Sequence, residues 1–150
     1  PDKPAPYYNL GGVLNNSGHK VEAAQRFLEA KERYRVGSMN WARATSEAFD
    51  TLRLPACDEV AKPEWWNDDE LKALSARVVR AAPNDLVANL MRACVLRGDI
   101  DAWVAGPRSA AELMEAAAHF DRAAALSYAP VMRAELARLA DRCRSRAVGI

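Results

Sequence analysis

Apolar residues recur at steps of three and four over most of this chain, which is the spacing of one face of an α-helix. The first such segment begins at Tyr7, and the polar run over 15–18 separates it from a second segment over 20–36. Further segments of the same kind begin at Ser38, Asp68, Asp85, Ser109 and Pro130. The pattern predicts an all-α chain of amphipathic helices, with Tyr7, Leu10 and Leu14 on the buried face of the first helix.

Residues that favour the ends of helices flank these segments. Gly98 suits the left-handed position that follows a helix, and Ser38 suits the position that caps the start of one. Ser109 and Glu112 match a capping box, in which each residue bonds to the backbone of the other. The other end signals are Gly18, Gly37, Asn67 with Glu70, and Pro130. Before the first helix, the proline-rich residues 1–6 predict an extended lead-in.

Parts of the chain are echoed at a distance. The run EAAQRFLEA over 22–30 returns as EAAAHFDRA over 115–123, and Trp41 lies 34 residues after Tyr7. A helical period of 34 residues, with an aromatic residue in the first helix and E-A-x-x-x-F-x-x-A in the second, resembles the tetratricopeptide repeat.

This resemblance implies a right-handed α-α superhelix, a tetratricopeptide-like solenoid, formed by a single domain over 1–150. In such a solenoid two short helices bury their apolar faces only by stacking on neighbouring pairs. The predicted parts are helix pairs over 7–37, 38–82 and 84–127 and a capping helix over 129–147. A polar outer face on the capping helix ends the stack, with Met132, Leu136, Leu139 and Cys143 facing inward.

Two segments interrupt the repeat between the two helices of a pair. They are RLPACDEVAKPEWWN over 53–67 and DIDAWVAGPRSAA over 99–111. Because both occupy the same kind of loop, we expect them to emerge on one edge, where they could meet. Their most distinctive side chains are Trp65, Trp66, Trp103 and Arg108. We favour the interpretation that these loops fold back and seal the core. The alternative is an exposed interaction edge in which these residues bind a partner.

The resemblance also implies a concave groove lined by the first helix of each pair. The residues at the corresponding positions are Tyr8, Asn9, Asn15, Asn16, Arg43, Ser46, Asn89 and Arg97. Side-chain amides such as Asn9 both donate to and accept from an extended peptide backbone. A peptide-binding groove is therefore one interpretation, and the other is that Asn9 is solvated or bonds to a local carbonyl.

The overall charge favours neither nucleic acid nor membrane as a partner. Lys and Arg total 21 against 20 Asp and Glu, and no apolar run is long enough to span a bilayer. The three cysteines, Cys57, Cys94 and Cys143, match neither a disulfide framework nor a zinc site. We therefore expect a cytoplasmic or other reducing intracellular compartment.

The chain lacks the common motifs of catalysis. His19 and His119 have no neighbouring nucleophile in the sequence, and no phosphate loop or metalloprotease motif occurs. Asp68, Asp69 and Glu70 suit the start of a helix better than a metal site. We predict a protein with no enzymatic activity, no cofactor and no metal, whose partner is a protein or peptide. Two hypotheses stand: a peptide-binding adaptor that uses the groove, and a structural subunit that docks through the tryptophan edge as part of a larger protein or complex.

Overall fold

The computed structural model describes residues 3–98 and 101–150, and these residues form helices and loops without a β-strand. The elements are α1 (Pro4–Asn16), α2 (Lys20–Arg33), α3 (Met39–Leu52), the short 3-10 helix η1 (Pro55–Cys57), α4 (Asp68–Ala81), α5 (Leu86–Arg97), α6 (Ala110–Leu126) and α7 (Pro130–Val148). The predicted all-α class is confirmed.

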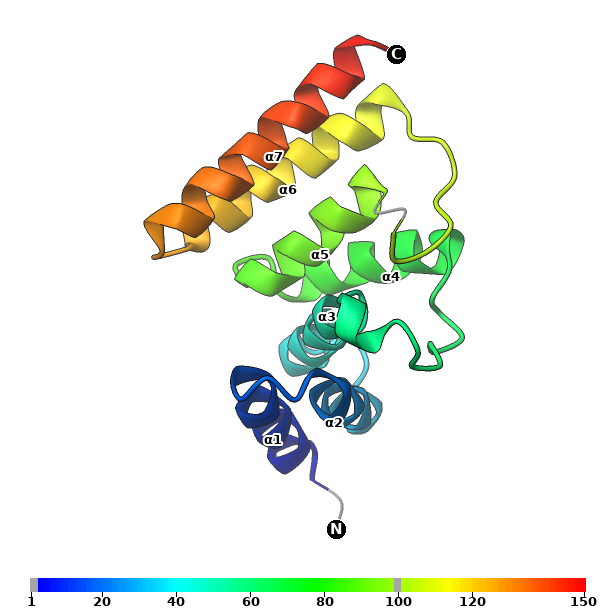
Figure 1. Ribbon diagram of the computed structural model, residues 1–150, viewed down its shortest axis with the longest axis vertical. Helices are drawn as coiled ribbons and strands as arrows, with labels where there is room; N and C mark the ends of the chain where they lie inside the picture. The colour runs from blue at the N-terminus through cyan, green and yellow to red at the C-terminus, as the bar shows by residue number, and fades with distance from the viewer. Residues whose placement is uncertain (1–2, 99–100) are drawn as a thin grey trace.

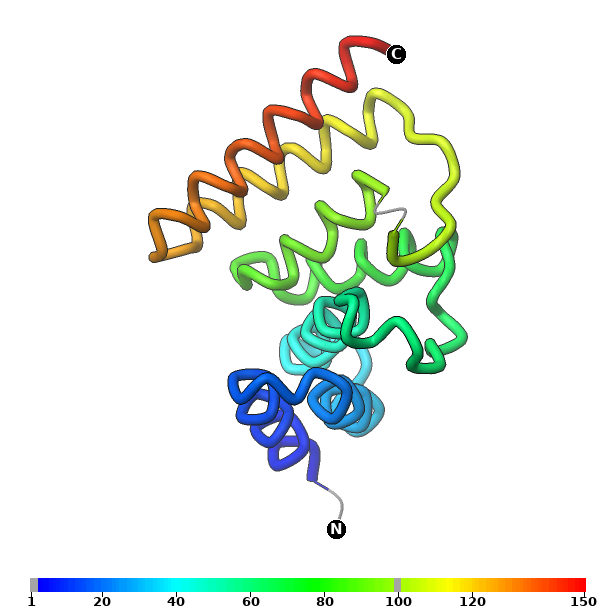
Figure 2. The backbone as a smooth tube through the Cα atoms, viewed as in Figure 1, coloured from blue at the N-terminus to red at the C-terminus, as the bar shows by residue number. Residues whose placement is uncertain are grey.

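Consecutive helices pack against each other along the whole chain. Figure 1 shows them stacked in chain order along the long axis, with α1 and α2 at one end and α6 and α7 at the other. The backbone trace shows α6 and α7 lying side by side along their lengths (Figure 2). In addition, α3 contacts α5 directly. Neighbour packing of this kind is what short amphipathic helices need to bury their apolar faces.

Most of the predicted helix ends are confirmed. They could be predicted because the hydrogen bonds that form them join residues close in the sequence. The hydroxyl of Ser38 accepts from the backbone N–H of Trp41 at 3.1 Å. Ser109 and Glu112 form the complete capping box, and Gly98 ends α5 in the left-handed conformation with φ of 81°. In the same way, Asn67 caps α4 and Pro130 begins α7.

Two predicted boundaries are wrong. The lead-in over 1–6 was expected to be extended, but α1 begins at Pro4, while residues 1–2 lie outside the described residues. Proline is tolerated there because a backbone N–H has no helical partner in the first turn. The second helix ends at Arg33 and not at Val36. Tyr34 has an extended backbone, and its ring packs edge-on against Tyr8 with 6.5 Å between ring centroids.

The buried face of α1 also differs from the prediction. Leu10 is 46% exposed, whereas Gly11 is buried against the ring of Phe27 on α2. A β-carbon at Gly11 would lie 2.8 Å from that ring, closer than carbon atoms approach. Phe27 thus occupies the space of a side chain at position 11, and the Tyr8 side of α1 faces α2 instead of the Leu10 side.

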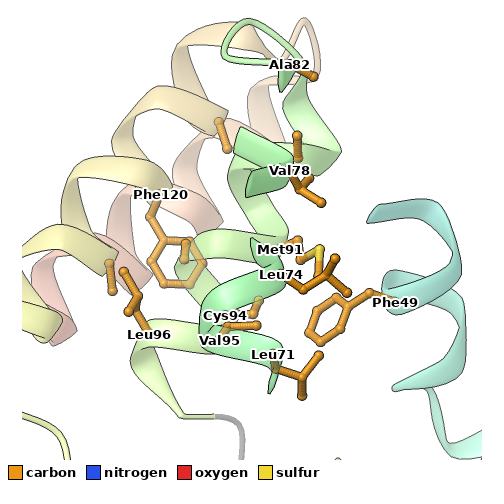
Figure 3. Packing of buried hydrophobic residues seen from close by; sticks show 14 of the residues in the cluster. Phe49, Leu71, Leu74, Val78, Ala82, Met91, Cys94, Val95, Leu96 and Phe120 are labelled. Atoms are coloured by element: carbon orange, nitrogen blue, oxygen red, sulfur yellow. The ribbon is translucent and has the colours of Figure 1, made fainter. Parts of the chain in front are cut away.

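The main hydrophobic core joins α3 to α7. In Figure 3, Phe49 of α3 points toward Leu74 and Met91, and Phe120 of α6 lies on the other side of α5. A smaller cluster around Phe27 joins α1, α2 and α3. Every helix therefore shares a hydrophobic interior with its neighbours. The candidate binding groove lies at the part of this interior that α5 and α7 form.

Candidate functional site

The two insertions meet in the folded chain. The indole Nε1 of Trp66 donates to the carbonyl oxygen of Ala102 at 2.9 Å, and the rings of Trp66 and Trp103 lie 6.3 Å apart edge to face. Both indoles also contact Phe49 in the core, with centroid distances of 5.3 Å for Trp66 and 5.9 Å for Trp103. Trp103 is only 6% exposed, which supports the interpretation that the loops seal the core.

Asp68 and Arg108 form the polar centre of this junction. The guanidinium of Arg108 donates to both oxygens of Asp68, at 2.6 and 2.9 Å, and also to the carbonyl oxygens of Val95 and Leu96. Asp68 accepts further bonds from Trp103 Nε1 and from the backbone of Gly106, each at 3.0 Å. Hydrogen bonds from Arg108, followed by those from Trp103 and Gly106, hold the pKa of Asp68 well below its usual range.

These contacts favour the interpretation that the tryptophan-bearing loops seal the core. Trp103 and the side chain of Arg108 are buried, so neither is available to a partner on this edge. Trp65 and Trp66 are half-buried against the core. Arg108 instead donates to the carbonyl oxygens of Val95 and Leu96 in the last turn of α5, where a helix runs short of N–H donors.

The predicted groove residues on α1 differ in their exposure to solvent. Asn9 and Asn16 are exposed, whereas Asn15 accepts a bond from Lys20 Nζ at 2.6 Å through its side-chain oxygen. Tyr8 is half-buried, with its ring 5.6 Å from that of Phe27. Of this group, Asn9 and Asn16 thus present free surface.

Ser46 and Asn89 do not line an open groove. Ser46 is fully buried and bonds to the carbonyl oxygen of Arg43 on its own helix. Asn89 is 1% exposed, and its amide donates to the carbonyl oxygens of Pro83 and Asp85. Its side-chain oxygen lies 3.0 Å from Nδ1 of His119, whose pKa is lowered by burial. Asn89 therefore joins the α4–α5 turn to α6, because a buried amide must have its bonds satisfied.

Arg43, one of the predicted groove residues, lies on a polar surface that also contains Glu47, Asp50 and Asp85. Its guanidinium lies 5.5 Å from the ring of Tyr8, and its Nε is 3.6 Å from the carboxylate of Asp85. One turn further along α3, burial raises the pKa of Glu47 to about 7. Asp50 and Asp85 add to this effect and Arg43 opposes it. This acid-rich surface is contributed by α1, α3 and the start of α5.

An apolar groove of about 570 Å³ lies between α5 and α7. Its apolar lining comes from Leu90, Cys94, Val131, Met132, Leu136 and Leu139. Met132 was expected to face inward, but it is 43% exposed, and the neighbouring Val131 is 84% exposed. The reason is that α7 packs on α6 through the face that contains Ala140 and Cys143, which leaves its Val131–Met132 side at the groove.

The charged residues of the groove are not equally neutralised. Arg53 pairs with Asp50 at 2.9 Å, and Glu135 pairs with Arg138. Arg97, at the end of α5, has its guanidinium 5.4 Å from the ring of Phe120, and no described residue forms an ion pair with it. Arg146 donates to the carbonyl oxygen of Arg97 and adds a second positive charge nearby. The Arg97 end of the groove is therefore basic.

Other kinds of site find no support in residues 3–98 and 101–150. No three His, Cys, Asp or Glu side chains in these ranges converge as metal ligands would. No helix within them combines the length and apolar character that a membrane span requires. No family model, curated protein or solved structure matches this chain. The tetratricopeptide resemblance therefore stays a prediction, and the function is argued from the groove itself.

Proposed function

We propose that this chain is a non-enzymatic protein interaction module with a tetratricopeptide-like superhelical arrangement. In this proposal, the groove between α5 and α7 binds an apolar segment of a protein partner that carries acidic residues at one end. The observation that supports it most directly is the combination of a 570 Å³ apolar groove with an unneutralised basic end at Arg97.

The size and lining of the groove suit this occupant. Its volume falls in the range of natural ligand pockets, and it is open along the exposed Met132 and Val131 side chains. Methionine adapts its shape to different apolar partners. A superhelix would place the first helices of the pairs, α1, α3, α5 and α7, along one surface, and the contact between α3 and α5 is consistent with this. The groove then occupies the C-terminal part of that surface.

The charges orient the partner. Arg97 and Arg146 attract acidic residues to one end of the groove. An apolar segment with acidic residues at one end thus has one favourable direction.

A display library of random short peptides, selected on the purified chain, tests the proposal. We expect enriched peptides with apolar residues followed or preceded by Asp or Glu. Met132→Glu should weaken their binding tenfold or more, because burying a methionine side chain contributes about 2 kcal/mol. Met114→Glu is the matched control, because Met114 on α6 is 47% exposed and lies outside the groove.

Arg97→Gln separates the charge from the apolar contacts. It should weaken peptides with an acidic end by about tenfold and leave purely apolar peptides unchanged. Enriched peptides without apolar residues, or equal binding by the wild type and Met132→Glu, would contradict the proposal.

A further inference from the structure

A second pocket, of about 300 Å³, lies between α2, the start of α3, the first insertion and α4. Its principal lining residues are Lys31, Val36, Trp41, Trp65, Leu74 and Arg77. None of them lines the α5–α7 groove, so the two sites are built from different residues.

Two cations converge on the aromatic wall of this pocket. Lys31 Nζ lies 5.5 Å from the ring centroid of Trp65 and 5.9 Å from that of Trp41. The guanidinium carbon of Arg77 lies 5.2 Å from the centroid of Trp41. Burial lowers the pKa of Lys31, Glu32 opposes this, and the positive charge of Arg77 lowers the pKa further. The two charges are therefore close enough to repel each other.

Glu32 acts on this pair only at a distance: its charge raises the pKa of Lys31, but it forms no ion pair with it. Neither Lys31 nor Arg77 forms an ion pair with any described carboxylate, including the exposed Glu70 on the rim of the pocket. An aromatic ring attracts a cation through its quadrupole but carries no net charge. Lys31 thus lies over Trp41 and Trp65, and Arg77 over Trp41, so two positive charges flank a space bounded by indoles and aliphatic side chains. An oxyanion between Lys31 and Arg77 would relieve their repulsion.

We propose that this pocket binds an oxyanion carried on an aromatic body. Lys31 and Arg77 contact the oxyanion, while Trp65, Val36 and Leu74 contact the body. Arg77 offers a planar pair of donors and Lys31 a compact charge, a combination that suits phosphate and carboxylate oxygens. The source is either a free small molecule or a modified side chain of a partner protein, and the pocket provides the same chemistry for both.

The probe is phenyl phosphate, titrated at constant ionic strength because salt screens such contacts. Binding is followed by the indole N–H resonances in NMR spectra. We expect saturable shifts of the Trp41 and Trp65 indoles. The Trp103 indole is the internal reference, because it is bonded to Asp68 at the insertion junction. Phenol, which lacks the charge, and inorganic phosphate, which lacks the ring, should each bind at least tenfold more weakly.

Substitutions of Lys31 and Arg77 test whether these two side chains bind the oxyanion of phenyl phosphate. Arg77→Gln and Lys31→Gln should each weaken phenyl phosphate about tenfold, the usual effect of losing one charged hydrogen bond. Arg80→Gln is the matched control, because Arg80 is an exposed arginine on the same helix and outside the pocket. Circular dichroism verifies that each variant is folded, and the exposed Arg77 position keeps the test valid if Lys31→Gln unfolds.

A capped peptide with a central phosphotyrosine distinguishes the two sources. Binding of both probes supports a side-chain ligand, and binding of phenyl phosphate alone supports a free small molecule. The proposal is overturned if neither probe shifts Trp41 and Trp65 selectively, or if a folded Arg77→Gln variant binds as tightly as the wild type. In that case the cations only cover the indoles.

Discussion

At the scale of single residues, Asp68 has the largest number of long-range bonds to the second insertion. We predict that Asp68→Asn lowers the free energy of unfolding at neutral pH by about 3 kcal/mol, because it leaves the buried guanidinium of Arg108 without its carboxylate. Urea unfolding measures this. Asp69→Asn is the control: Asp69 is exposed beside it, and the change should be within about 0.5 kcal/mol.

The acid dependence of this contribution has a definite sign. Because the pKa of Asp68 is lowered in the folded chain, its stabilisation is present above the ordinary carboxyl value. It is lost as the pH falls through the lowered value. The difference between the wild type and Asp68→Asn should therefore be constant near neutrality and shrink below about pH 4. A difference that grows in acid would contradict this role.

For Glu47 we predict that the contribution to the free energy of unfolding depends on pH in the opposite direction. Its pKa is raised from 4.5 to about 7, so its charged form destabilises the fold. The penalty is absent below about pH 4 and increases until the pH passes through about 7. Glu47→Gln should therefore raise the free energy of unfolding by on the order of 2 kcal/mol above neutrality and change little near pH 4. Chemical unfolding at several pH values tests this, with the exposed Glu32→Gln as control.

Residues whose partners are local could be predicted from the sequence, and residues with distant partners could not. Ser109 bonds within its own first turn, so its capping role follows from the chain itself. Asp68 suits a helix start equally well, but its main partners lie 35 to 40 residues away. Asn89 matched a groove position, yet its bonds to the α4–α5 turn and to His119 required the folded chain.

At the scale of elements, the rotation of a helix depends on its partner. The three- and four-residue steps predict that α1 is amphipathic, but Gly11 contributes no apolar signal although it is buried against the ring of Phe27. The pattern therefore placed Leu10 on the buried face. In α7, similarly, one apolar stripe contains both the contact with α6 and the wall of the groove, and the sequence does not separate them.

Two adjacent glycines test the packing of α1. We predict that Gly11→Ala lowers the free energy of unfolding by about 1–3 kcal/mol, because the new methyl group would lie 2.8 Å from the ring of Phe27. Gly12→Ala should instead raise stability by up to about 1 kcal/mol, since nothing lies within 4 Å of its β-carbon position and alanine favours the helix. Thermal unfolding compares the two; equal effects would exclude this packing.

Replacing Trp103 tests how the second insertion contributes to stability. Trp103→Ala should cost about 3–5 kcal/mol of stability, because it removes a buried indole from the junction with Phe49 and Trp66. Peptides selected for the groove should still bind below the unfolding temperature, because Trp103 does not line the groove. Unchanged stability with loss of a partner would favour docking through this edge instead.

At the scale of the whole molecule, the sequence predicts a stack of helices and a common edge for the two insertions, because both follow from periodicity and loop position. The location of the apolar groove could not be predicted in this way. Family positions pointed to polar residues on α1, α3 and α5, and of these only Arg97 lines the apolar groove between α5 and α7. It arises because α7 packs on α6 through the face that contains Ala140 and Cys143, which leaves its Val131–Met132 side at the groove.

The central claim is that this groove binds an apolar partner segment. The most direct measurement is a methyl NMR titration with the strongest peptide selected on the wild-type chain. The account predicts saturable shifts of the methyl groups of Leu90, Met132 and Leu139, with Met114 unaffected. Shifts confined to residues outside the groove, with Leu90, Met132 and Leu139 unchanged, would contradict it.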